Sequence, residues 1–172
     1  MSITNTSSVN MNQFRQKRLV GELDLTTNPN PSVMTVRPDY FLAETDDSPY
    51  LFGEGVKLVD LGANDSEGPP VVTKREEDND EIFGVRVFST KQGQGSPYRP
   101  IEIAFKGAVI WMEASAALER GAQVSLVQAE PGQVQAVGDF AYFGVALDKA
   151  SDEGDLVRVM IMADGITEGT AT

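Results

Sequence analysis

Apolar and polar residues alternate along most of this chain, in short runs that end at proline, glycine, asparagine or aspartate. The alternation is clearest at residues 56–58, 124–126 and 157–161. Successive side chains of a strand point to opposite faces, so a period of two predicts strands that are half buried. Clusters of turn-forming residues separate these runs. The pattern therefore predicts a mainly β protein made of short strands.

One segment departs from this alternation. Residues 113–120, with the sequence EASAALER, are rich in strong helix formers. Gly121 follows them, at the position where glycine often ends a helix. We therefore predict one short helix at 113–120, after a buried strand at 109–112.

The pattern of residues 51–107 returns at residues 117–165. Each copy begins with a glycine and a short alternating strand, continues with a Phe-Gly-Val segment, and closes with a strand that ends near a glycine. Loop length accounts for the difference in spacing between the copies. The matched glycines are Gly55 with Gly121, Gly84 with Gly144, and Gly107 with Gly165.

The Phe-Gly-Val segment places a glycine between two apolar residues of a strand in both copies. Such a glycine marks a bend, a bulge or a close approach of two backbones. Two related units of several short strands indicate a compact β-barrel or sandwich with pseudo-twofold character. We expect four of the glycines to be structural: Gly55, Gly84, Gly121 and Gly144.

The length of 172 residues fits one domain, and the composition limits its chemistry. The chain has no cysteine and no histidine, which excludes thiolate nucleophiles, Ser-His-Asp triads and zinc sites with Cys or His ligands. The acidic run at 76–81 lacks the ligand order of an EF-hand, so a solvated loop is expected rather than a calcium site. Trp111, the single tryptophan, is expected in the core. We predict no catalytic residue, no cofactor and no metal.

Charge is distributed unevenly along the chain. The formal net charge is −12, from 26 acidic and 14 basic residues, yet residues 1–20 contain three cations and no acid. An acidic body argues against nucleic-acid binding. No apolar run is long enough to cross a membrane, and the polar N-terminus lacks the pattern of a secretory signal. These features predict a basic N-terminal arm at 1–20, a β-rich domain at 21–163 and a flexible tail at 164–172.

Two groups of residues are candidates for contacts with other molecules. The end of the arm combines an aromatic anchor with cations that can bind carboxylates, which predicts a docking segment that orders on a partner. Its residues are Phe14, Arg15, Lys17 and Arg18. On a strand, Phe140 and Tyr142 share one face while Phe143 takes the other, so that pair is a candidate subunit contact.

Residues of the second copy resemble the C-terminal half of a known family. The segments are ERGAQV at 119–124, FGVAL at 143–147 and LVRV at 156–159, separated by glycine-containing turns. In this order they are similar to the capsid cement proteins, the head decoration proteins of tailed bacteriophages. The segment around Gly55 and Gly84 resembles the family's earlier half, so the resemblance covers about residues 50–163. The first 50 residues and the long loop at 62–80 depart from the family pattern.

The resemblance implies a non-enzymatic virion protein. It would be made in the cytoplasm of the bacterial host and would bind the outer surface of the phage head. There it would bridge neighbouring capsomers and stabilise the lattice of the major capsid protein. Its partners would be that protein and itself, with a homotrimer favoured and a dimer possible. The alternatives are another virion or surface β-module, such as a tail, fibre or glycan-binding domain, and a glycan hydrolase that uses only carboxylates.

Overall fold

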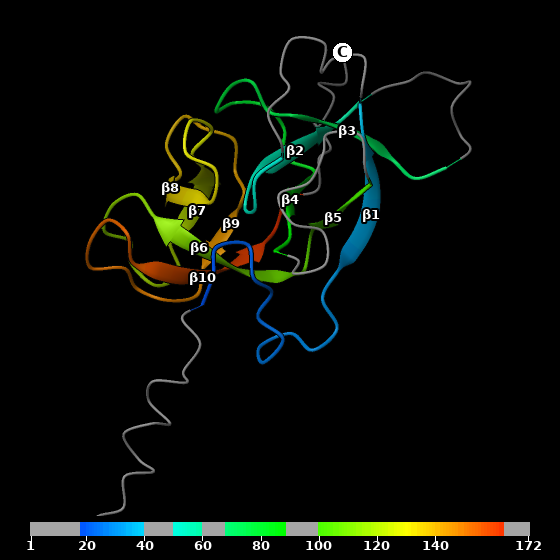
Figure 1. Cartoon of the computed structure of the whole chain (residues 1–172). Coiled ribbons are helices and arrows are strands. Elements are labelled where there is room, and N and C mark those ends of the chain that lie inside the picture. The colour runs from blue at the N-terminus through cyan, green and yellow to red at the C-terminus, as the bar shows by residue number, and fades with distance from the viewer. Residues whose placement is uncertain (1–17, 40–49, 60–67, 89–99, 164–172) are drawn as a thin grey trace, which may run out of the picture.

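The computed structural model describes residues 18–39, 50–59, 68–88 and 100–163, and the ten strands in these ranges form two small closed barrels that lie side by side (Figure 1). The first barrel contains β1 (Val33–Pro38), β2 (Gly55–Leu58), β3 (Val71–Lys74), β4 (Gly84–Arg86) and β5 (Ile101–Ala104). The second contains β6 (Val109–Ala114), β7 (Gln123–Leu126), β8 (Gln133–Ala136), β9 (Gly144–Ala146) and β10 (Leu156–Ile161). The predicted mainly β, barrel-type fold is confirmed.

The second barrel repeats the strand order and pairing of the first. Around the first barrel the order is β1-β3-β2-β4-β5, and around the second it is β6-β8-β7-β9-β10. The first strand of each barrel runs parallel to the third and antiparallel to the fifth, and all remaining pairs are antiparallel. Each repeat is thus a unit of five strands. The predicted repeat boundaries, 51–107 and 117–165, leave out β1 and β6, which open the two units.

The registers of the two barrels define which residues correspond. Val56 pairs with Gly84 in the first barrel, and Val124 pairs with Gly144 in the second. Gly84 and Gly144 therefore occupy the same position of the repeat, at the start of β4 and of β9. In both barrels the short Phe-Gly-Val segment therefore marks the start of the fourth strand, at the residue paired with the second strand.

A second pair of glycines matches differently from the sequence comparison. Gly55 corresponds to Gln123, because each pairs with the residue that follows the repeat glycine of β4 or β9. Gly121 instead corresponds to Gly53, and the two have φ angles of +85° and +80°. Both occupy the turn before the second strand of their barrel, where a left-handed backbone favours glycine. The pairing of Gly55 with Gly121 is thus corrected by two residues.

The predicted helix at 113–120 does not form, and the described residues contain no helix at all. Glu113 and Ala114 end β6, and the amide of Ser115 donates to the carbonyl of Val134. Leu118 forms an isolated antiparallel bridge with Ala150. Strand pairing with distant segments therefore outweighs the local helix propensity, which is a weak preference. In the described ranges, no helix is long and apolar enough to span a membrane.

The hydrophobic core joins the two barrels. Val85 and Ala104 of the first barrel belong to the same buried cluster as Met112, Phe143 and Ile161 of the second. A smaller cluster fills the inside of the first barrel and contains Val36, Tyr50, Val56, Val72, Ile101 and Ile103. The outer face of β4 and β5 is thus covered by the second barrel, and the two barrels form one packed body.

Candidate functional site

The chain enters the fold along the edge of β6. We call residues 18–28 the entry segment. The amide of Gly21 donates to the carbonyl of Trp111 over 2.8 Å, and the amide of Asp24 donates to that of Val109 over 2.9 Å. The amide of Trp111 donates in return to a carbonyl of the segment. The entry segment therefore runs antiparallel to β6 and forms one isolated bridge with it, between Leu23 and Ile110.

Apolar side chains fix the entry segment at the junction of the barrels. Leu23 packs against the shared core. Val20 lies where Gly53 and Gly132 approach each other, and a Cβ on either glycine would overlap its side chain. Since residues 18–20 contact the body, the part of the predicted arm that precedes the described fold is residues 1–17.

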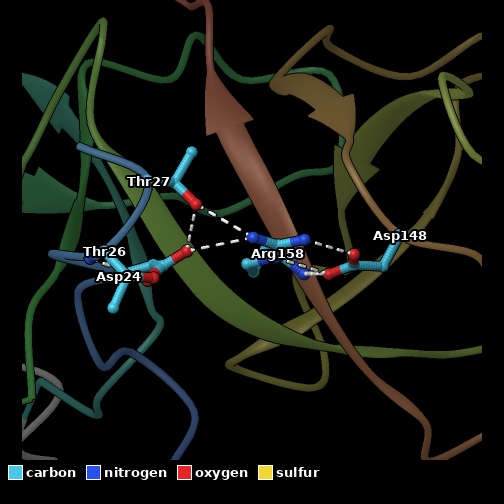
Figure 2. A network of polar contacts seen from close by, with 5 residues as sticks. All are labelled: Asp24, Thr26, Thr27, Asp148 and Arg158. Atoms are coloured by element: carbon cyan, nitrogen blue, oxygen red, sulfur yellow. Dashed lines mark hydrogen bonds and ion pairs between the residues drawn. The ribbon is translucent and has the colours of Figure 1, made fainter.

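The guanidinium group of Arg158, on β10, binds side chains of the entry segment (Figure 2). Arg158 donates from Nε and Nη2 to the two carboxylate oxygens of Asp148, over 2.8 and 2.7 Å. On its other side, Nη1 donates to the hydroxyl of Thr27 over 2.9 Å and reaches Asp24 Oδ2 at 3.4 Å. Two-point bonding of a guanidinium to a carboxylate is a strong and directional contact. We call Asp24, Thr26, Thr27, Asp148 and Arg158 the Arg158 network.

The buried carboxylate of this network is Asp24, whose exposed fraction is 2%. It accepts hydrogen bonds of 2.5 Å from the hydroxyls of Thr26 and Thr27, and one of 3.1 Å from the amide of Thr26. Burial alone would raise the pKa of Asp24, but these bonds together with that from Arg158 outweigh it and lower the pKa to about 2. The hydrogen bond from Arg158 is also the main reason why the pKa of Asp148 is lowered.

The network leads to an expected pH dependence. An Asp with a lowered pKa stabilises the fold above its unfolded pKa of 3.8 and loses that contribution as the pH falls through the folded value, here about 2. Between pH 5 and pH 2, we expect the free energy of unfolding to fall by about 2 kcal/mol more in the wild type than in Asp24→Asn. Urea denaturation at several pH values measures this difference. Parallel pH profiles for the two proteins would contradict it.

Trp111 has two cations near its ring and lies outside both core clusters, which corrects its expected place in the core. The guanidinium carbons of Arg18 and Arg158 each lie 5.8 Å from the centroid of its ring. Arg18 also forms an ion pair of 2.7 Å with Glu22. The half-buried indole therefore reports on how the entry segment sits against β10.

The predicted contact residues fall into two groups. Phe14, Arg15 and Lys17 lie outside the described residues, whereas Arg18 is bound within its own chain as described above. Phe140 and Tyr142 are 38% and 39% exposed, while Phe143 is fully buried in the core. Residues 140–143 precede β9 and do not lie in a strand, so the expected strand faces do not form here. The subunit contact through the exposed pair stays a prediction.

The four glycines predicted to be structural have different surroundings. A Cβ on Gly84 would lie 2.7 Å from the carbonyl oxygen of Ala104, and one on Gly144 would overlap that of Met160. At Gly55 the nearest atom is a methyl group of Leu126, at 2.6 Å. Gly121 has open space around it but a positive φ. Gly84 and Gly144 therefore exclude a side chain by backbone contact, and Gly121 excludes one by backbone conformation. At Gly55 the contact is with a side chain that can move.

The acidic run is a structured loop that connects the barrels. The buried Arg75 donates to the carbonyls of Glu77, Asp78 and Asp80. Asp78 accepts from the amide of Gln128 in the second barrel, over 2.8 Å. The expected solvated loop is therefore tied at both ends, and the described residues contain no group of three acidic side chains that could hold a metal.

Sequence reasoning missed the Arg158 network and the role of Arg75. Asp24 and Arg158 are 134 positions apart, so no local pattern connects them. A local signal did exist at one end, since aspartate followed by two threonines favours a turn in which the carboxylate accepts nearby bonds. The alternation of residues 156–161 also places Arg158 on the outer face of its strand.

Comparison with known proteins finds likeness in structure but none in sequence. No family model matches this chain, and no characterised protein matches it in sequence. The fold is similar to that in a crystal structure of the head fiber gp8.5 N base in bacteriophage phi29, with a TM-score of 0.46 and 16% sequence identity. The similarity covers 75% of this chain and 92% of that chain. No residue role is transferred between proteins at this distance.

Proposed function

We propose that this protein is a non-enzymatic structural component of a phage virion. It binds the outer surface of the head and stabilises the lattice of the major capsid protein by bridging neighbouring capsomers. The observation that carries the proposal is the resemblance of residues 119–124, 143–147 and 156–159 to the capsid cement proteins. These segments form the turn and strand β7, the strand β9 and the strand β10 of one barrel. The resemblance thus falls on one contiguous structural unit.

The chemistry of the Arg158 network supports the non-enzymatic part of the proposal. A glycan hydrolase needs one carboxyl group with a raised pKa to act as general acid. Asp24 and Asp148, the two carboxylates that face each other across Arg158, both have lowered pKa values. Their oxygens are already bonded to donors of the same chain. These carboxylates fasten the fold and are poorly suited to donating a proton.

The stabilising mechanism is mass action on the assembled state. A protein that binds the assembled lattice but not its separated parts stabilises the lattice by about 2.7 kcal/mol per site at a hundredfold excess over Kd. Bridging requires more than one contact per bound unit, which self-association supplies. Phe140 and Tyr142 are the proposed contact between copies, with a trimer favoured over a dimer.

Removing residues 1–17 is expected to weaken binding to heads without unfolding the body. This deletion takes away Phe14, Arg15 and Lys17 but keeps Val20 and the Arg158 network. We expect a nearly unchanged melting temperature and a lower occupancy on heads. Binding of the full chain should also weaken with added salt, since exposed charges are screened over about 8 Å at physiological ionic strength.

The matched control is the full chain with Arg15→Gln and Lys17→Gln. It keeps the length of the arm and removes two charges, so it should lose most of the salt dependence. Co-sedimentation with heads at several salt concentrations gives the occupancies. Equal occupancy for the full chain and the deletion at every salt concentration would contradict a docking arm.

A further inference from the structure

The matching registers reveal a difference between the two barrels at one edge. The amide of Arg37 donates to the carbonyl of Pro70 as the amide of Glu113 donates to that of Gly132, so β1 and β6 correspond residue by residue. By this correspondence, residues 33–35 of β1 match residues 109–111 of β6. The latter are the residues that the entry segment covers.

Within the described ranges, no segment covers the edge of β1 as the entry segment covers that of β6. Among the described residues, none bonds to the backbone of Thr35 on the side where the entry segment bonds to Trp111. The residues of the β1 edge are also more exposed than their counterparts in β6. Val109 and Ile110 are 1% and 0% exposed, whereas their counterparts Val33 and Met34 are only half-buried and Thr35 is exposed. The first barrel therefore offers an edge whose equivalent in the second barrel binds an extended segment of this same chain.

We propose that the edge of β1 at residues 33–35 binds an extended segment from a second copy of this chain, namely Gln13, Phe14 and Arg15. The segment pairs antiparallel with β1, as the entry segment pairs with β6. An exposed strand edge is a template for such pairing. This inference concerns self-association and does not depend on the virion role. It assigns Phe14 and Arg15 to a second copy and not to the head surface, and it adds a contact between copies to the one proposed at Phe140 and Tyr142.

The charged residues beside the edges of β1 and β6 differ in sign, and this difference indicates which segment could bind to β1. Arg158 lies opposite Trp111, and Glu102 lies opposite the equivalent Thr35, so a cation of the second barrel is replaced by an anion in the first. Asp24 of the entry segment reaches Arg158. A strand on β1 therefore needs a cation at the place of Asp24, and Arg15 provides one.

The apolar position of the donor segment fits as well. The order polar, apolar, charged in Glu22, Leu23 and Asp24 recurs in Gln13, Phe14 and Arg15, with the sign of the last charge reversed. Leu23 forms its bridge with Ile110 and packs on the shared core. Phe14 takes the equivalent place opposite Met34, where half-buried apolar surface is available.

Chain length indicates that the donor is a different copy. Arg15 and Arg18 are three residues apart, a span of at most about 11 Å. Arg18 is fixed over Trp111 in the second barrel. The described chain begins beside that barrel, whereas β1 is a strand of the first barrel and is drawn to the right of β4 and β5 in Figure 1. A copy next to it can supply the segment without this restriction.

A charge exchange tests the proposal in the full chain. Arg15→Glu and Glu102→Arg should each weaken self-association by roughly fivefold, because each turns an attraction into a repulsion. The protein with both substitutions should associate about as well as the wild type. Sedimentation equilibrium over a range of concentrations measures this. Two single variants that associate like the wild type, or a double variant that fails to recover, would overturn the proposed pairing.

Disulfide trapping detects the contact between residues 13–15 and the edge of β1 even when association is weak. The chain has no cysteine, so engineered ones are the only thiols present. Arg15→Cys mixed with Glu102→Cys should give a linked pair of chains on oxidation, and Glu119→Cys, on the exposed side of the second barrel, should not replace Glu102→Cys. With both substitutions in one chain, an internal disulfide as the main product would overturn the proposal, since the donor would then be the same copy. Equal linking to the control position would overturn it too.

Discussion

Gly144→Ala is expected to lower the free energy of unfolding by about 3 kcal/mol or more, the upper range for overpacking a closed core. The added methyl group would overlap the carbonyl oxygen of Met160 on β10, to which β9 is paired. This atom belongs to the backbone and not to a flexible side chain, so β9 and β10 would have to separate. Gly84→Ala should behave similarly, because its Cβ would lie 2.7 Å from the corresponding oxygen of Ala104.

Two further glycines separate this effect from a general cost of alanine. Gly138 has no positive φ, and no atom lies within 4 Å of the place that a Cβ would take, so Gly138→Ala should change stability by less than about 1 kcal/mol, with a gain allowed. Gly121 has open space but a φ of +85°, so Gly121→Ala should cost about 1 kcal/mol. Urea denaturation of the four variants tests this order. A Gly144→Ala protein as stable as Gly138→Ala would contradict the close approach of β9 and β10.

Arg158→Met is expected to lower the free energy of unfolding by about 2 kcal/mol and to change the fluorescence of Trp111. Methionine keeps much of the aliphatic length of the side chain but removes the guanidinium donors to Asp148 and Thr27, while the backbone amide of residue 158 still donates to Asp148. It also leaves the buried Asp24 without its cationic neighbour, although the two threonines still donate to it. Removing one partner of a buried charge pair costs several kcal/mol, and partial exposure of Arg158 reduces that figure here.

A surface cation gives the matched control for this prediction. Lys149 pairs with Glu119 over 3.0 Å, and their side chains are 59% and 79% exposed. Lys149→Met should therefore change stability by less than about 1 kcal/mol and leave the fluorescence of Trp111 unchanged. Arg18→Met should alter the fluorescence with little loss of stability, because Arg18 is an exposed partner of the same ring. If Arg158→Met matched Lys149→Met in both measurements, the Arg158 network would not fasten the entry segment.

The alternation along the chain was sufficient to predict the class of fold, and the reason is burial. In a closed barrel one face of each strand is inside, so residues 56–58, 124–126 and 157–161 carry the period of two directly in their sequence. The helix expected at 113–120 failed for the opposite reason. Its formers have weak preferences, and the bonds of Ser115 and Leu118 go to residues that lie far along the chain.

The functional features could be predicted from the sequence only where they did not depend on contacts between distant residues. The glycine of Phe-Gly-Val could be recognised because its constraint recurs in both copies at the same register. The Arg158 network could not, because Asp24 meets Arg158 only after the entry segment has paired with β6. The difference between the edges of β1 and β6 also required the structure, since the sequence does not indicate which strand has a neighbour.

The most direct test of the proposed role is binding to assembled heads. Heads of the parent phage, stripped of this protein, would be incubated with increasing amounts of the purified full chain and sedimented. The ratio of bound copies to major capsid protein would then be measured. We predict saturable binding at a fixed ratio, with heads that become more resistant to heat, and little binding to unassembled capsid protein. Protein that stays in the supernatant at saturating concentration, or that binds assembled and unassembled capsid protein equally, would contradict the account.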